Sequence, residues 1–198
     1  MLASGAQMTT IQLSYNEAQT LARKAANGAG LPHGVAEDIG GAAVWLSARG
    51  VDAIGVVVAA LSDCQPAILA GQAAIDALCC GESDEVNVDD DNPRLLLIGL
   101  AGAAAMNMGL SLAVRFRNGD VVSLAQVSDL ADQASSIEAL RLTSRNTDDM
   151  SERLVSRRPA ATDTKAYAAA LGLAAKTYVP ASELSRVQGA GAGTTDND

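Results

Sequence analysis

The sequence predicts an α+β fold with an Ala-rich helical N-terminal half, a small antiparallel sheet, a C-terminal helix and a glycine-rich terminal segment. Apolar residues recur at helical spacing through the N-terminal half, the period changes to two from Leu110, and Asn118-Gly119 is a strong hairpin signal. A hydrophobic content of 48% allows one domain with a sizeable core. We expect residues 1–10 to be an N-terminal extension and residues 11–198 to form a single domain.

A first helix is predicted over residues 15–27. Ser14 and Glu17 have the Ser-x-x-Glu spacing of a capping box, in which each residue satisfies a backbone amide of the other. Gly28 follows as a stop signal. Ala18, Leu21, Ala22 and Ala25 fall on the predicted inner face, together with Tyr15 and Ala29.

A second helix is predicted over residues 35–49. Gly40 and Gly41 lie in its middle, where each costs about 1 kcal/mol relative to Ala. Such glycines are expected where another backbone approaches closely, so we predict a tight crossing with the first helix. Trp45, one step from the apolar stripe, is expected to pack in the core.

Two further helices are predicted next, and they are followed by a segment whose secondary structure can be interpreted in two ways. Asp52 can cap a third helix through Leu61, and Pro66 begins a fourth that continues to about Leu78. Asn92-Pro93 favours a helix over residues 94–107. The alternative is a buried strand over residues 94–100, followed by a turn into a helix.

The sheet is predicted from residue 110 onward. Residues 110–116 alternate in polarity, and residues 121–127 return after the hairpin turn. Residues 137–145 and 153–157 resemble two further strands. Arginines are distributed over these segments: Arg115, Arg117, Arg141, Arg145 and Arg157. They form an anion-recognition surface if several share a face, and a solvated outer face otherwise.

The last predicted helix begins after Thr162 or Asp163 as its cap and runs to Lys176. Its apolar stripe is expected to consist of Ala168, Leu171, Ala175 and Tyr178.

The net charge of −9, from 23 acidic and 14 basic residues, repels phosphate backbones and anionic lipid. We therefore expect neither nucleic acid nor a membrane as partner. Acidic residues concentrate between Glu82 and Asp91, which we interpret as a solvated loop. Their order does not fit a calcium-binding loop.

Cysteine and histidine are too few and wrongly spaced for a zinc site: Cys64, Cys79, Cys80 and His33 form no ligand pattern. We expect no metal. Reduced cysteines, the lack of a signal-peptide pattern and the lack of a long uninterrupted apolar stretch predict a soluble cytoplasmic protein.

The candidate site lies at the C-terminal end of the chain. Alternating Gly and Ala over residues 189–193 can turn backbone amides toward a ligand, next to hydroxyl, carboxylate and guanidinium groups. The predicted ligand-binding residues are Tyr178, Ser182, Ser185, Arg186, Gly189, Gly191 and Gly193. Arg186 would hold a small anion and Glu183 would be the catalytic residue, exchanging a proton or orienting the substrate.

Whether the protein is an enzyme stays open at this point, and no cofactor is indicated. The alternative function is a noncatalytic subunit or a homo-oligomer that packs through Ala-rich helix faces and the terminal segment.

Two blocks of sequence resemble an uncharacterised bacterial family, the DUF3726 domain proteins. The first block comprises residues 13–17 and 22–31, and the second comprises residues 177–183, 185–186, 189–193 and 196–198. The resemblance implies that the C-terminal block belongs to the domain, and it implies no named activity. Residues 14–51 are also similar to the N-terminal helices of malate/lactate-type dehydrogenases outside the Rossmann class. Their Asp-Ser-His-Gly sequence does not occur here, where Val51-Asp52-Ala53-Ile54 stands instead.

Overall fold

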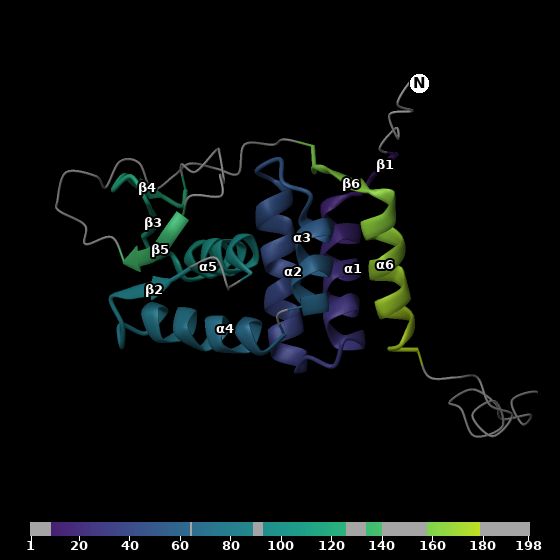
Figure 1. Cartoon of the computed structure of the whole chain (residues 1–198), viewed down its shortest axis with the longest axis horizontal. Helices are drawn as coiled ribbons and strands as arrows, with labels where there is room; N and C mark the ends of the chain where they lie inside the picture. Colours follow the sequence, from purple (N-terminus) through teal and green to yellow (C-terminus); the bar gives the residue numbers. More distant parts are fainter. Residues whose placement is uncertain (1–8, 64, 89–92, 126–133, 140–157, 179–198) are drawn as a thin grey trace, which may run out of the picture.

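The computed structural model describes residues 9–63, 65–88, 93–125, 134–139 and 158–178, and structural statements below refer to these residues (Figure 1). The elements in chain order are β1 (Thr10–Gln12), α1 (Tyr15–Gly28), α2 (His33–Ser47), α3 (Ala53–Asp63), α4 (Gln65–Cys79), β2 (Glu85–Asn87), α5 (Arg94–Met108), β3 (Leu112–Phe116), β4 (Val121–Ser123), β5 (Ala134–Ala139), β6 (Ala161–Asp163) and α6 (Thr164–Ala175). The predicted α+β class is confirmed.

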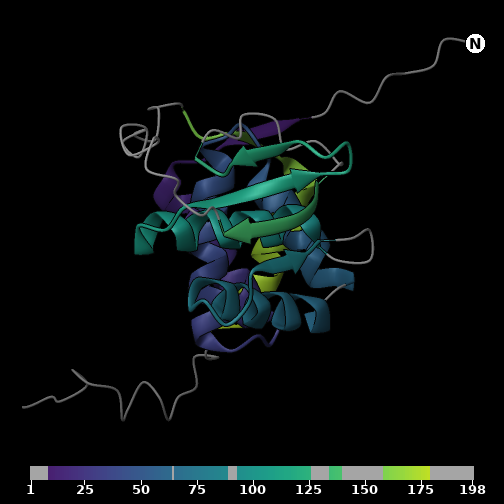
Figure 2. The ribbon, with the colours of Figure 1, turned by 90° about the vertical axis from the view of Figure 1, so that its left-hand side faces the viewer.

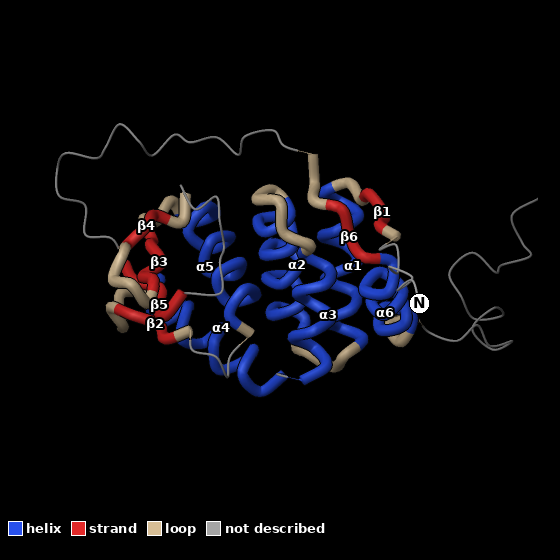
Figure 3. Tube along the Cα trace, turned by 45° about the horizontal axis from the view of Figure 1, so that its top comes forward, coloured by secondary structure: helices blue, strands red, loops and turns tan. Residues whose placement is uncertain are grey.

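Helices α1, α2, α3 and α6 pack together at one end of the molecule, and α4 and α5 connect them to a sheet at the other end (Figure 3). The predicted capping box begins α1: the Glu17 amide donates to Ser14 Oγ over 3.2 Å, and the Ser14 amide donates to Glu17 Oε2 over 2.8 Å. The Ser14 amide and the Ser14 hydroxyl, which donates to Glu17 Oε2 over 2.7 Å, hold the pKa of Glu17 below its usual value, because both bonds favour the charged carboxylate.

The predicted crossing of α1 and α2 is confirmed at one of the two glycines. A Cβ on Gly40 would lie 3.2 Å from the Gln19 carbonyl oxygen of α1. Gly41 faces another helix, since a Cβ there would lie 3.7 Å from Ala103 of α5. Adjacent residues on a helix point about 100° apart, so the two glycines serve different neighbours.

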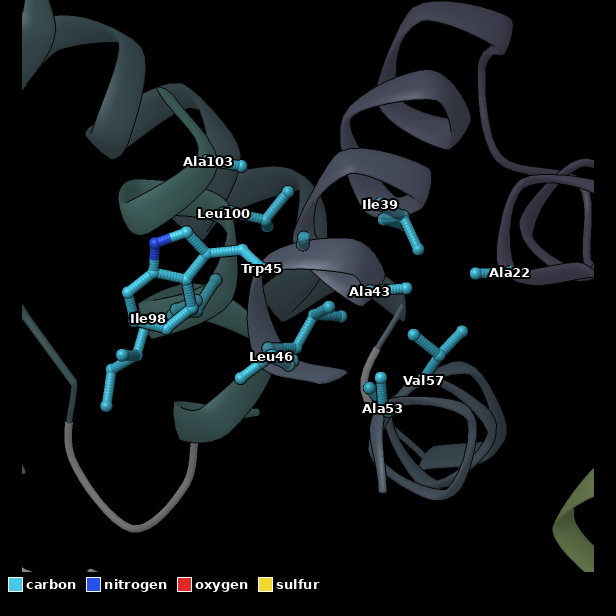
Figure 4. Close-up of a cluster of buried hydrophobic side chains, with 14 of the residues drawn as sticks. Ala22, Ile39, Ala43, Trp45, Leu46, Ala53, Val57, Ile98, Leu100 and Ala103 are labelled. Carbon is cyan, nitrogen blue, oxygen red and sulfur yellow. The ribbon is translucent and has the colours of Figure 1, made fainter. Parts of the chain in front are cut away.

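Helix α2 is central because both of its sides are buried. Ala43 points toward Ala22 of α1, whereas Trp45 lies beside Ile98 on α5 (Figure 4). Trp45 is 2% exposed, which confirms its predicted core position. A Cβ on Gly102 of α5 would lie 2.1 Å from Trp45 Cε2, so the glycine provides the space that the indole fills.

The main sheet has four antiparallel strands in the order β2-β5-β3-β4, and it lies against α4 and α5 (Figure 2). The hairpin turn at Asn118-Gly119 is confirmed: Gly119 has a φ of 91°, and β3 pairs with β4. Ile137 of β5 pairs with Val114 of β3, and both are buried against the helices.

The structure tests the predictions for residues 82–91 and 94–107. Residues 94–108 form a helix, so the strand alternative is wrong. The acidic stretch is not only a loop, because Glu85–Asn87 forms β2 and pairs with β5. Val86 between two polar residues provides the buried side chain that this short strand needs. The predicted strand over 153–157 lies outside the described residues, as do residues 140–145 of the strand predicted over 137–145.

The chain returns to the helices through β6, which pairs with β1 to form a separate two-stranded sheet. Asp52 Oδ1 accepts a bond from the Gly55 amide at the start of α3, and its Oδ2 accepts one from the Asp163 amide, each over 3.0 Å. Asp163 in turn caps α6, as predicted, by accepting from the Lys165 amide over 2.8 Å. The carboxylate of Asp52 thus fixes where α6 begins.

The predicted inner stripe of α6 is wrong. Ala170 and Ala174 are buried, whereas Ala168, Leu171, Ala175 and Tyr178 are exposed. Because Ala, Leu and Gly occupy every side of this helix, the sequence periodicity does not determine which side faces the core.

No single helix in the described part of the chain is long and apolar enough to cross a membrane. Helices α3 and α4 reach that length and apolarity only together, and the chain bends by 115° between them.

Candidate functional site

Tyr178 is the member of the predicted site that the structure describes. Ser182, Glu183, Ser185, Arg186, Gly189, Gly191 and Gly193 lie outside the described residues. Their proposed roles therefore stay predictions, and the geometry of the site begins at Tyr178.

Tyr178 lies just beyond the end of α6 and contacts Lys24 of α1. Lys24 Nζ donates to the Tyr178 hydroxyl oxygen over 3.4 Å and lies 5.2 Å from the centre of the phenol ring. Both distances fit a cation held at an aromatic ring. Tyr178 is 64% exposed, so solvent and solutes reach this pair.

The approach of α1 to α6 brings these two side chains together. A Cβ on Gly28 would lie 1.9 Å from the Leu173 carbonyl oxygen. Only glycine fits at such a backbone contact, so Gly28 does more than end α1. The contact lies one turn beyond Lys24 on α1 and two residues before the end of α6.

Lysines are concentrated on the two helices that carry this pair, although the chain as a whole has a net charge of −9. Lys24, Lys165 and Lys176 are the lysines of the sequence, and all lie on α1 or α6 or at the α6 C-cap. Residues 164–178 contain neither Asp nor Glu. An ammonium and a phenol hydroxyl are donors that suit a carboxylate or phosphate oxygen.

Of the arginines predicted for the sheet, the structure describes Arg115 and Arg117. Arg115 Nη2 lies 2.6 Å from Glu138 Oε2, so a carboxylate already compensates this charge. Arg117 follows β3 in the hairpin turn, and Arg141, Arg145 and Arg157 lie outside the described residues. Whether several of these arginines share a face stays a prediction.

A polar cluster between α2 and α4 was not predicted. Gln72 Nε2 donates to Asp38 Oδ2 over 3.3 Å and to Asp76 Oδ1 over 3.1 Å. Burial raises the pKa of Asp38, and the nearby carboxylates of Asp76 and Glu37 raise it further. No sequence motif marks this cluster, because its residues meet only when the two helices pack.

Burial and the neighbouring Asp76 also raise the pKa of the Cys79 thiol, which favours the unreactive protonated form. Among the described residues, no three His, Cys, Asp or Glu side chains are grouped so that they could hold a metal ion. His33 lies at the start of α2, where Nε2 is 3.4 Å from Glu37 Oε1 and the side chain is 77% exposed.

Comparison with known proteins gives one family and no individual relative. Residues 13–93 match the family model DUF3726, described as a protein of unknown function. The matched segment contains the first of the two resembling blocks and runs from Leu13 through Pro93, whereas the second block lies outside it. No curated protein and no solved structure matches the chain. The resemblance to the DUF3726 family that the sequence suggested is thus confirmed over residues 13–93.

Proposed function

We propose that this protein binds a small anionic metabolite, with a carboxylate or phosphate group, where α6 ends. The observation that carries the proposal is the contact of the Lys24 ammonium with the exposed Tyr178 side chain, just beyond the helix end that carries Lys176. The aromatic ring limits the positions of the Lys24 side chain, so less conformational entropy is lost when an anion binds.

The remaining predicted residues follow directly in the chain. Ser182 is four residues beyond Tyr178, so it stays within about 14 Å of it in any conformation. Arg186 stays within about 29 Å by the same limit. In this proposal Arg186 and the amides of Gly189, Gly191 and Gly193 complete the anion site, with Ser182 and Ser185 as further donors.

Binding should be measured first with inorganic phosphate and citrate, by thermal unfolding at constant ionic strength. A ligand at 100 times its dissociation constant stabilises the folded state by about 2.7 kcal/mol. We expect Lys24→Met to remove most of the shift and Tyr178→Phe to reduce it. Lys165→Met is the matched control, since it removes the same charge at the other end of α6.

Two outcomes would contradict the proposal. One is the lack of a shift with phosphate, citrate and a broader panel of carboxylates and phosphate esters. The other is an equal loss for Lys24→Met and Lys165→Met, which would indicate general charge attraction without a site. Arg186→Ala should abolish the shift while the protein remains folded.

A catalytic role for Glu183 is the further part of this proposal. In it, Glu183 exchanges a proton with the bound anion or orients it. Glu183→Gln should leave ligand stabilisation in place and abolish any turnover of the same compound. A bacterial cytoplasm is the proposed location, supported by the free thiols of Cys79 and Cys80.

A second candidate function is that of a noncatalytic subunit or homo-oligomeric interaction protein. The observation that favours it is the exposed apolar side of α6. This second function does not require an anion site at Lys24 and Tyr178, so the two functions are compatible and can be tested separately.

A further inference from the structure

Tyr178 is the most exposed aromatic residue of the chain. The sequence has three Tyr, one Trp and one Phe, and the structure describes all of them. Trp45 is buried, Phe116 and Tyr167 are half-buried against the core, and Tyr15 is half-buried as well. Tyr178 is 64% exposed, so its ring offers a rigid apolar surface that a ligand can reach.

The last turn of α6 fixes the backbone that carries this ring. The Thr177 amide donates to the Ala174 carbonyl over 3.0 Å, and the Thr177 hydroxyl donates to the same carbonyl over 2.7 Å. The Tyr178 amide donates to the Ala175 carbonyl over 3.2 Å. Because the backbone is held in this way, the ring loses little freedom when a ligand contacts it.

The position of Lys24 leaves the faces of the ring accessible. A cation centred above a ring face lies closer to the ring centre than to the hydroxyl oxygen. Here the order is reversed, because Lys24 Nζ lies 3.4 Å from the Tyr178 oxygen and 5.2 Å from the ring centre. The ammonium therefore lies at the hydroxyl end of the side chain and does not cover either ring face.

We propose that the preferred ligand of this site is a planar aromatic carboxylate, of which benzoate is the simplest example. This inference rests on the proposed function, since it names the ligand class for the same two residues, Lys24 and Tyr178. In such a ligand the carboxylate extends from the ring in the same plane, as the hydroxyl of Tyr178 does. When the two rings stack in the usual offset arrangement, the carboxylate lies near the Tyr178 hydroxyl, where the Lys24 ammonium can pair with it.

The hydrogen-bond donors of the pair suit this arrangement. Lys24 donates to the Tyr178 oxygen, so the phenol proton stays available to donate to the carboxylate. The ligand then receives one bond from the phenol, one from the ammonium and a stacking contact from the ring. An aliphatic carboxylate receives the two bonds without the stacking contact.

Two compounds serve as matched probes of the stacking contact. Benzoate and cyclohexanecarboxylate carry one carboxylate each on a carbon ring of the same size, but only benzoate is flat and aromatic. Burial of apolar surface alone does not favour benzoate, because the cyclohexane ring is at least as apolar. Stacking should make benzoate bind about three to ten times more tightly. Both dissociation constants should lie in the millimolar range, because the site is an exposed pair of side chains.

The test titrates the full chain with each probe to about 50 mM at constant ionic strength and follows backbone amide and Tyr178 ring signals by NMR. Benzoate should shift the Tyr178 ring signals upfield through its own ring current, and cyclohexanecarboxylate should not. Tyr178→Leu should remove the preference for benzoate. Tyr178→Phe keeps the ring, so it should weaken both probes and retain the preference. Lys24→Met should weaken both probes at least fivefold, and Lys165→Met is the matched control that should leave both unchanged.

The outcomes separate this inference from the proposed function. Equal affinities for the two probes would overturn the inference and leave anion binding in place, as would a preference for benzoate that survives Tyr178→Leu. Binding of citrate or phosphate without binding of either probe would have the same meaning. Benzoate binding that Lys24→Met leaves unchanged would overturn the proposed function as well, because the ammonium would then not hold the anion.

Discussion

Helices α5 and α6 have similar compositions and opposite surroundings. Both are rich in Ala, Leu and Gly, and neither contains Asp or Glu. On α5, every residue from Leu96 to Ala103 is buried, because α2 and α4 on one side and β3 and β5 on the other cover it. On α6, only Ala170 and Ala174 are buried, against α1 and α3.

The comparison shows that the composition of a helix indicates whether it must be buried on all sides. It does not indicate which elements bury it. A helix that is apolar on all sides is normally enclosed. For α5 the enclosing elements belong to the same chain. For α6 the described residues enclose one side, and the side that contains Gly172 is exposed.

The largest expected effect is on the enclosed helix, from Gly102→Ala. The new Cβ would lie 2.1 Å from a rigid indole atom of Trp45, so the helices must separate. We expect a loss of about 3 kcal/mol in unfolding free energy, at the upper end of the range for overpacking. Urea denaturation measures it.

Two controls make this prediction specific. Gly41→Ala lies on the same seam but places its Cβ 3.7 Å from Ala103, an ordinary contact, so it should leave stability unchanged or raise it. In a Trp45→Leu background, Gly102→Ala should cost much less than in the native protein. Equal costs in the two backgrounds would show that the indole is not the obstacle.

The next largest effect concerns the start of α6. Asp52→Ala removes the acceptor for the Gly55 amide and the acceptor for the Asp163 amide. We expect a loss of about 2 kcal/mol, since one bond caps α3 and the other satisfies a half-buried amide. Asp52→Asn keeps one oxygen and should cost about half as much in the same denaturation experiment. Equal costs for Ala and Asn would mean that only one bond contributes.

A smaller effect of opposite sign is expected from Gly172→Ala. Since nothing described lies near the new methyl group, the helix propensity of Ala should stabilise the monomer by about 0.5–1 kcal/mol. Thermal unfolding at low protein concentration measures the monomer alone. A destabilised monomer would show that residues of the same chain already occupy this space.

The sequence predicted elements better than their orientation. Ser14 and Glu17 specify the start of α1 locally, and Asn118-Gly119 specifies a turn within four residues, so both follow from short-range chemistry. Strands β1, β2 and β6 were missed because each has only three residues, too few for a period of two to be recognised.

Side-chain direction was predictable only where polar residues mark the outer side of a helix. Helix α1 carries Glu17, Arg23 and Lys24 on its outer side, so the buried Ala18, Ala22 and Ala25 were identified correctly. Ala26, which is also buried, was missed, and Ala29 is only partly buried. Helix α6 has no such residues between Lys165 and Lys176, and its inner side depends on the contact with Gly28 of α1. Of the candidate site, sequence identified Tyr178 but not Lys24, because the two are 154 residues apart and meet only through that contact.

The smallest expected effect on stability comes from Asp38, a partly buried carboxylate between α2 and α4. Because the folded state raises the pKa of Asp38, it binds more protons than the unfolded chain between the ordinary value near 4 and the raised value. Stability therefore falls as pH rises through that window. Asp38→Asn should raise the unfolding free energy at pH 7 by less than about 1 kcal/mol, with no gain below about pH 4.

Asp76→Asn removes one of the repelling carboxylates, so the Asp38 carboxyl, followed by NMR, should titrate at lower pH in that variant. An unchanged titration would remove Asp76 from the explanation and would leave burial and Glu37 as the causes.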